Sequence, residues 1–201
     1  KAALLRSSEE WDFIIPNLKQ LIYATTGREL PIAVTEVNSN WSNRSRSETT
    51  PDSLVNAIWW ADAFGRMMKQ GVSIVNQFAL DGTGGWALFG TQEPRPSYFV
   101  YLLYRDFGHQ LVESASGIDL VSVYAALDDS GNLTMILVNR NPKAMSIPME
   151  LRGFTPAGSE RWLLLDVDHM AEEISGATFG TLSNLILPAH SGVFISLEPG
   201  A

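Results

Sequence analysis

The pattern of apolar residues changes near residue 115, and this change is the feature that most constrains the fold. Before it, long amphipathic segments alternate with short apolar runs, as in parallel sheets covered by helices. After it, short alternating runs follow one another between turn residues, as in antiparallel sheets packed face to face. The sequence therefore predicts an α/β domain over residues 1–114 and an all-β antiparallel sandwich over residues 115–201.

In the first part, the runs 31–38 and 72–80 are rich in β-branched residues and predict buried parallel strands. The amphipathic segment between them predicts a crossover helix with Thr50 as its cap and Gly71 as its end. Trp59 and Trp60 are adjacent on this helix, so at most one is expected to face inward. Further helices are predicted over residues 8–26 and 96–107, the former with an inward apolar stripe of Trp11, Ile14, Ile15, Leu18, Leu21 and Ile22 that Gly27 ends.

In the second part, turn residues separate short runs of alternating polarity. Asp128 to Gly131 is a strong hairpin signal between two of these runs. The predicted strands cover residues 119–126, 132–140, 146–151, 161–168, 184–187 and 193–198.

Glu36 is the residue that most needs an explanation. A charge is costly to bury in a run of Ile, Val and Thr, so this carboxyl group must be paired, protonated or open to a pocket. In parallel α/β folds the carboxyl ends of the strands form the ligand-binding face. The residues alone leave two possibilities open: a catalytic carboxylate, or a Glu held by a nearby Arg or Lys.

The run Pro31-Ile-Ala-Val-Thr-Glu36-Val-Asn38 resembles the seventh strand of glycoside hydrolases that share a (β/α)8 barrel and two catalytic glutamates. Residues 72–80, the loop with Trp86 and the segment 94–98 are similar to their eighth strand and eighth helix. A trailing β-sandwich is common among them, notably in families like the β-xylosidases, α-L-arabinofuranosidases and endoglucanases. The resemblance thus implies a partial (β/α)8 barrel, its last two to three βα units, followed by the sandwich.

The resemblance implies that Glu36 is the nucleophile of a retaining mechanism acting on β-linked oligo- or polysaccharides. Such a mechanism needs a second carboxyl group about 5 to 5.5 Å away to protonate the leaving oxygen. Nothing in the sequence matches this acid/base residue, which the family carries on its fourth strand. We therefore expect a C-terminal portion of a longer enzyme, inactive alone, that self-associates through its exposed barrel edge or binds the missing N-terminal half.

Four residues are candidates for contact with the sugar. Trp86 and Trp41 offer flat apolar faces that suit the C–H groups of a pyranose ring, although packing would explain either. Asn38 is expected on the same side of the strand as Glu36, where it would bind substrate or orient the carboxylate. Gln77 alternates with Asn76, so one of the two would face the barrel interior. Asp81 precedes Gly82 and is expected to cap a loop rather than to replace the missing acid.

Composition excludes several other functions. With 14 Lys and Arg against 22 Asp and Glu, the formal charge is −8, which argues against a nucleic-acid partner. The absence of cysteine excludes disulfides and thiolate sites, and His109, His169 and His190 lie too far apart to suggest a metal. No apolar run is long enough to predict a spanning helix. We expect no cofactor, and we favour a secreted or extracellular bacterial location although the residues leave the compartment open.

Two other roles remain for the predicted sandwich. It would be a carbohydrate-binding or accessory module if its aromatic residues formed a flat platform, or a brace for the barrel if they lie in its core. Most of them occupy positions expected in strand cores: Tyr124, Phe154, Trp162, Phe179 and Phe194.

Overall fold

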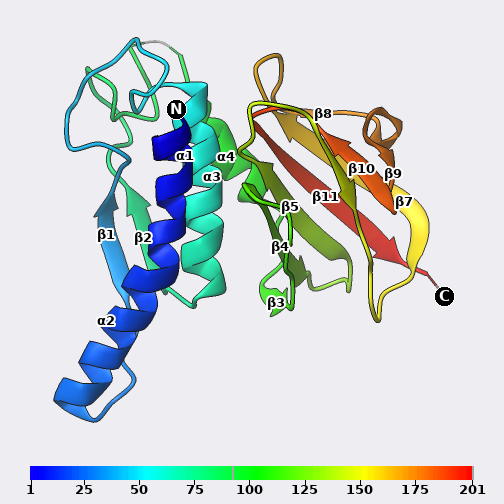
Figure 1. Cartoon of the computed structure of the whole chain (residues 1–201), viewed down its shortest axis with the longest axis horizontal. Helices are drawn as coiled ribbons and strands as arrows, with labels where there is room; N and C mark the ends of the chain where they lie inside the picture. The colour runs from blue at the N-terminus through cyan, green and yellow to red at the C-terminus, as the bar shows by residue number, and fades with distance from the viewer. Residues whose placement is uncertain (92, 201) are drawn as a thin grey trace. The chain divides into compact units, whose positions relative to one another are not determined.

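The computed structural model describes residues 1–91 and 93–200, and it divides into two compact units (Figure 1). The first unit comprises Lys1–Ser97 and the second Tyr98–Ala201. Residues 98–114, which the sequence grouped with the first part, belong to the second unit. The reason is β3 (Gln110–Val112), an unpredicted strand that pairs antiparallel with β4 (Val121–Leu127).

Two parallel strands joined by a helix form the centre of the first unit. β1 (Ala33–Val37) pairs with β2 (Ile74–Gln77), with Ala33 opposite Ile74 and Val37 opposite Gln77. A register shift between Val34 and Val37 marks a bulge near the end of β1. The predicted strand, crossover helix and parallel strand are therefore confirmed. Helices complete the unit: α1 (Ala2–Ser7), the 3-10 helix η1 (Ser8–Glu10), α2 (Trp11–Thr26) and α3 (Leu54–Lys69).

The helix α3 begins later than its sequence predicts. Ser53 is the cap, because its side chain accepts a hydrogen bond from the backbone N–H of Asn56 at 3.1 Å. Thr50 instead holds the preceding turn, where its hydroxyl donates to Asp52 at 2.6 Å. Trp59 and Trp60 are both buried, so the expectation that at most one faces inward is wrong.

The burial of both tryptophans follows from the covering of α3 on more than one side. The indole N–H of Trp59 donates to the hydroxyl of Ser7 on α1 at 3.1 Å. Trp60 packs against Phe64 of the same helix, with ring centroids 5.6 Å apart. Every residue from Val55 to Ala63 is buried, so this stretch of α3 is covered on all its faces.

The helix α2 leaves most of its apolar residues exposed. Ile15 is its one buried residue, whereas Phe13 is 70% exposed and Leu21 62%. The predicted inward stripe is therefore wrong, because α2 is covered along one edge only. Pro16 lies inside the continuous helix α2. The prediction that Gly27 ends this helix is confirmed, and Gly27 has the left-handed conformation.

The two strands are covered on one face and open on the other. Along β2 and the residues after it, exposed side chains alternate with half-buried ones, and Ile74, Phe78 and Leu80 are 52%, 42% and 67% exposed. In β1 only Val37 is buried. The prediction of strands buried on both faces is wrong, because nothing among the described residues covers the second face.

The second unit contains two antiparallel sheets that share one hydrophobic core. The six-stranded sheet has the order β3-β4-β5-β11-β7-β8 and the three-stranded sheet the order β6-β10-β9. Side chains of both sheets, such as Leu137, Leu164 and Leu185, meet in the core. The remaining elements are α4 (Pro96–Tyr104), β5 (Leu133–Asn139), β6 (Met145–Pro148), β7 (Pro156–Leu165), β8 (Met170–Glu173), η2 (Gly176–Phe179), β9 (Gly180–Thr181), β10 (Asn184–Leu187) and β11 (Ser191–Pro199).

The six strands predicted in this region are all present within a few residues, whereas β3, β8 and β9 were not predicted. The hairpin signal is confirmed, since β4 and β5 pair antiparallel across the turn that begins at Asp128. The carboxylate of Asp128 accepts the backbone N–H groups of Ser130 and Asn132 at 2.8 and 2.9 Å, and Gly131 supplies the positive φ that the turn requires.

An ion pair connects Asp106, two residues beyond the end of α4, to a strand of the six-stranded sheet. The guanidinium of Arg161 on β7 lies 2.7 Å from the carboxylate of Asp106. Hydrogen bonds from Arg105 and then from Arg161 lower the pKa of Asp106 to about 2. Since the pKa in the folded state lies below the usual value, this interaction stabilises the second unit above about pH 4, and the stabilisation is lost as the pH falls towards 2.

We predict that Asp106→Asn lowers the free energy of unfolding of the second unit by about 0.5–1 kcal/mol at pH 7, the range for a partly exposed ion pair. Urea unfolding followed by circular dichroism measures this loss. The difference from the wild type should shrink as the pH falls from 4 to 2. The control is Glu198→Gln, a change from a carboxylate to an amide at an exposed residue of the same unit. Equal stability of Asp106→Asn and the wild type at pH 7 would contradict the prediction.

Candidate active site

Glu36 lies at the carboxyl end of β1, with its side chain exposed. The next residue, Val37, is buried and lies opposite Gln77 of the parallel strand β2. Among the described residues, no cation and no hydrogen-bond donor contacts the Glu36 carboxylate. The arginine or lysine partner that the sequence left open is therefore not found in this part of the chain, and the carboxylate is accessible.

Asn38 ties the ends of the two parallel strands together. Its amide donates to the backbone carbonyl of Phe78 at 2.5 Å, and its Oδ1 accepts the backbone N–H of Ser39 at 2.9 Å. The backbone N–H of Phe78 in turn donates to the carbonyl of Val37 at 3.0 Å. Asn38 is half-buried, and these contacts give its amide a role in holding the strand ends next to Glu36.

The fully buried side chain of Asn56 connects three segments of the first unit. Its Oδ1 accepts a hydrogen bond from the hydroxyl of Ser39, and its amide donates to the carbonyl of Pro51 at 2.8 Å and to the hydroxyl of Ser97 at 3.0 Å. A residue near the start of α3 therefore fixes both ends of residues 38–53, which we call the first loop.

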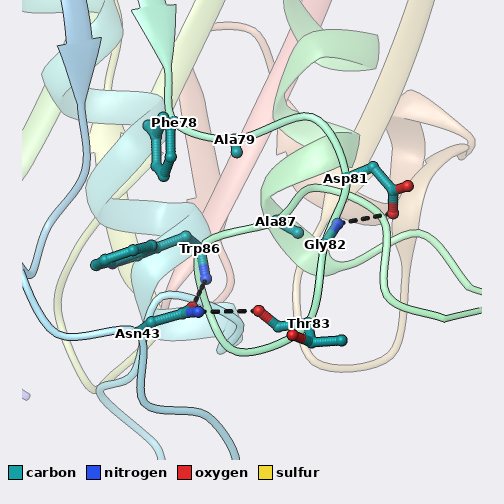
Figure 2. Close-up of a pocket in the computed structure, with 8 residues that line it drawn as sticks. All are labelled: Asn43, Phe78, Ala79, Asp81, Gly82, Thr83, Trp86 and Ala87. Atoms are coloured by element: carbon teal, nitrogen blue, oxygen red, sulfur yellow. Dashed lines mark hydrogen bonds between the residues drawn. The ribbon is translucent and has the colours of Figure 1, made fainter.

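A cleft of about 220 Å³ lies between the first loop and residues 78–91, which we call the second loop (Figure 2). Trp86 contributes to its wall and is half-buried. The ring of Trp86 meets that of Phe78 edge to face, with centroids 5.5 Å apart and an angle of 71°. The peptide bond between Phe78 and Ala79 is cis. The lining residues are Asn43, Phe78, Ala79, Asp81, Gly82, Thr83, Trp86 and Ala87.

The structure brings only one of the predicted site residues into this cleft. Trp86 lines it, whereas Glu36, Asn38, Trp41 and Gln77 do not. Trp41 is 92% exposed on the first loop. Gln77 belongs to the half-buried side chains of β2, and its Oε1 is buried with no hydrogen-bond partner among the described residues, while Asn76 is the exposed amide of the pair.

Asp81 has the loop role expected from the sequence. Its carboxylate accepts the backbone N–H of Gly82 at 2.7 Å (Figure 2). Sequence reasoning missed Phe78, Asn43 and Thr83. An aromatic residue at the carboxyl end of the second strand was the available signal for Phe78, but nothing in the sequence indicated that Asn43 and Thr83 meet.

Neither a metal site nor a membrane-spanning helix is found among the described residues. No group of three or more His, Cys, Asp or Glu side chains there is arranged to hold a metal ion. None of the helices in the same part of the chain has both the length and the apolar composition to cross a bilayer.

Most aromatic residues of the second unit that we considered as a sugar platform are buried: Tyr124, Trp162, Phe179 and Phe194.

Comparison with known proteins gives matches among solved structures only. No family profile and no curated protein matches the sequence. A bifunctional glucanase-xylanase from a metagenome library is 22% identical with a TM-score of 0.71, and the match covers 92% of this chain and 34% of that protein. A Paenibacillus polymyxa xyloglucanase is 20% identical over 92% of this chain and 35% of its own, with a TM-score of 0.71.

A monomeric β-xylosidase from Caulobacter crescentus is 18% identical, with a TM-score of 0.65 over 96% of this chain and 50% of its own. The chain has the fold of part of a glycoside hydrolase. The resemblance drawn from the sequence is thus confirmed at the level of the fold. The chain spans only about a third to a half of these enzymes, from 34% to 50% of their length.

We predict that Asn56→Ala lowers the free energy of unfolding of the first unit by about 2 kcal/mol, because it leaves the partners of a buried amide unsatisfied. Thermal or urea unfolding measures the effect. The control Asn76→Ala removes an exposed amide from β2 and should change stability by less than about 0.5 kcal/mol. A loss of similar size in both variants would contradict the role assigned to Asn56.

Proposed function

We propose that this chain is part of a retaining glycoside hydrolase that cleaves β-linked oligo- or polysaccharides, with Glu36 as the nucleophile. The accessible Glu36 carboxylate at the carboxyl end of a parallel strand is the observation that carries the proposal. The likeness to solved glucanases, xylanases and a β-xylosidase supports a carbohydrate hydrolase. In this proposal the first unit is the last part of a (β/α)8 barrel and the second a sandwich that braces it.

The proposed reaction assigns one chemical step to Glu36. Its carboxylate oxygen attacks the anomeric carbon, an ester bond to the sugar forms, and the bond to the leaving oxygen breaks. Water then hydrolyses the ester in the second step. A carboxylate that no cation neutralises and that solvent reaches is suited to this attack. Protonation of the leaving group, typically worth 10²- to 10⁴-fold, needs a second carboxyl group, for which we find no candidate among the described residues.

The cleft between the two loops is the proposed contact surface for one sugar residue. Trp86 offers an apolar face, and the carboxylate of Asp81 adds a polar group at the wall. Trp41, exposed on the same loop as Asn43, would contact a neighbouring sugar. In this proposal Asn38 holds the strand ends near Glu36. Gln77, which is half-buried, remains a predicted contact.

An activated substrate analogue tests the role of Glu36 without the missing acid. A dinitrophenyl 2-deoxy-2-fluoro-β-xyloside or -glucoside releases dinitrophenolate, which needs no protonation, and the fluorine slows hydrolysis of the ester. Incubation of the 201-residue chain should add one fluorosugar to the peptide that contains Glu36, as measured by mass spectrometry after digestion.

Two variants make this labelling experiment specific. Glu36→Gln should abolish the label, whereas Glu29→Gln, a change at an exposed residue that precedes β1, should leave it unchanged. Labelling of another residue, or equal labelling of Glu36→Gln and the wild type, would contradict the assignment of Glu36 as the nucleophile.

The apolar faces left open in the first unit have the character of an interface. β1 has an unpaired edge in its two-stranded sheet, and α2 exposes Phe13 and Leu21. The chain also spans only a third to a half of the related enzymes' length. Both observations support a partner that covers these faces. We propose that this partner is the segment with the remaining barrel strands or, where that segment is absent, a second copy of this chain.

We predict concentration-dependent self-association of the 201-residue chain, measured by light scattering between micromolar and millimolar concentrations. Phe13→Lys combined with Leu21→Lys should weaken it, because charges would replace apolar contacts on α2. Ile186→Lys changes an apolar residue of the second unit that is 52% exposed, and serves as the control. A strictly monomeric chain at millimolar concentration would count against this interface.

A further inference from the structure

The side chain of Asn43 joins the two loops of the candidate site. Its Oδ1 accepts the backbone N–H of Trp86 at 3.1 Å, and its amide donates to the carbonyl of Thr83 at 2.9 Å (Figure 2). Its backbone carbonyl also accepts the N–H of Gly85 at 3.3 Å. One residue of the first loop thus makes three hydrogen bonds, each to a different residue of the second loop: Thr83, Gly85 and Trp86.

Two glycines of the second loop make this close approach possible. A Cβ on Gly84 would lie 2.3 Å from the Asn43 amide nitrogen, and one on Gly85 would lie 1.9 Å from the carbonyl oxygen of Arg44. Gly84 also has a φ of +88°, which other residues rarely adopt. The two glycines at positions 84 and 85 therefore fit the second loop closely against the first loop.

The indole of Trp86 is held at its other end by the same loop. Its Nε1–H donates to the carbonyl of Asn40 at 2.9 Å. The hydrogen bonds that Trp86 donates to Asn40 and Asn43 thus fix both its backbone and its ring against residues that follow Glu36 in the chain. Among the described residues, the ring of Trp86 contacts one other aromatic ring, that of Phe78.

We propose that Asn43 is a positioning residue that fixes the Trp86 indole at the wall of the cleft, and that it thereby sets the affinity of the cleft for a sugar ring. The second part rests on the proposed function. A side chain that acts only on stability would leave the environment of the Trp86 ring unchanged in the folded protein. A positioning residue alters that environment in variants that remain folded.

The test uses the 201-residue chain with its six tryptophans replaced by 5-fluorotryptophan and followed by fluorine NMR. Trp86→Phe assigns the resonance of Trp86. In Asn43→Ala this resonance should shift or broaden while the other five stay in place. Asn43→Asp keeps the acceptor for the Trp86 N–H and loses the donor to Thr83, so it should resemble the wild type more closely than Asn43→Ala.

Gly85→Ala and Ser45→Ala complete the set of variants. Gly85→Ala forces the loops apart while leaving Asn43 intact, so it should move the Trp86 resonance as well. Ser45→Ala changes an exposed residue of the first loop and should not. An unmoved Trp86 resonance in both Asn43→Ala and Gly85→Ala, with circular dichroism showing folded protein, would overturn the proposal.

Calorimetric titration with xylohexaose and cellohexaose separates this inference from the proposed function. Asn43→Ala should weaken binding about tenfold, because it removes the two side-chain hydrogen bonds that hold Thr83 and Trp86 in place. Equal affinity in Asn43→Ala and the wild type would overturn the link to sugar binding. If the Trp86 resonance moves but the wild type binds neither sugar, the positioning role is supported and the proposed function fails.

Discussion

The parallel pairing of β1 with β2 is the constraint on which the candidate site depends. Parallel strands place their carboxyl ends at one edge of a sheet, so the loops that follow them must meet there. The amide of Asn38 reinforces this edge with its hydrogen bond to the carbonyl of Phe78. The carboxylate of Glu36 is thereby brought to the edge where the loops that follow both strands begin, although the cleft itself does not include it. Loss of this pairing would separate the two halves of the site.

The sequence predicted the elements better than it predicted what covers them. The β-branched runs gave β1 and β2, and the Asp128 turn gave the hairpin of β4 and β5, because each depends on local preferences and spacing. The inward face of α2 was wrong, since apolar periodicity predicts that a face is suited to burial but not that a partner is present. For the same reason the buried strands proved open on one face, and Trp59 and Trp60 proved buried together.

The sequence could indicate a site residue only where that residue differs in chemical character from its neighbours in the chain. Glu36 stood out as a charge in an apolar strand, and Trp86 as an aromatic residue in a glycine-rich loop. Asn43 gave no such signal, because its role depends on contacts with residues 83–86, which are distant in sequence. Asn56 was also missed, since its three partners lie on segments whose meeting only the fold determines.

The central claim is that sugar binds at the edge where β1 and β2 end. A crystal structure of the chain with a bound xylo- or cello-oligosaccharide tests it most directly. The account predicts a sugar ring against the face of Trp86, with the anomeric carbon of the adjacent residue directed towards the carboxylate of Glu36. An oligosaccharide bound only to the second unit, with the cleft between the two loops empty, would contradict the account.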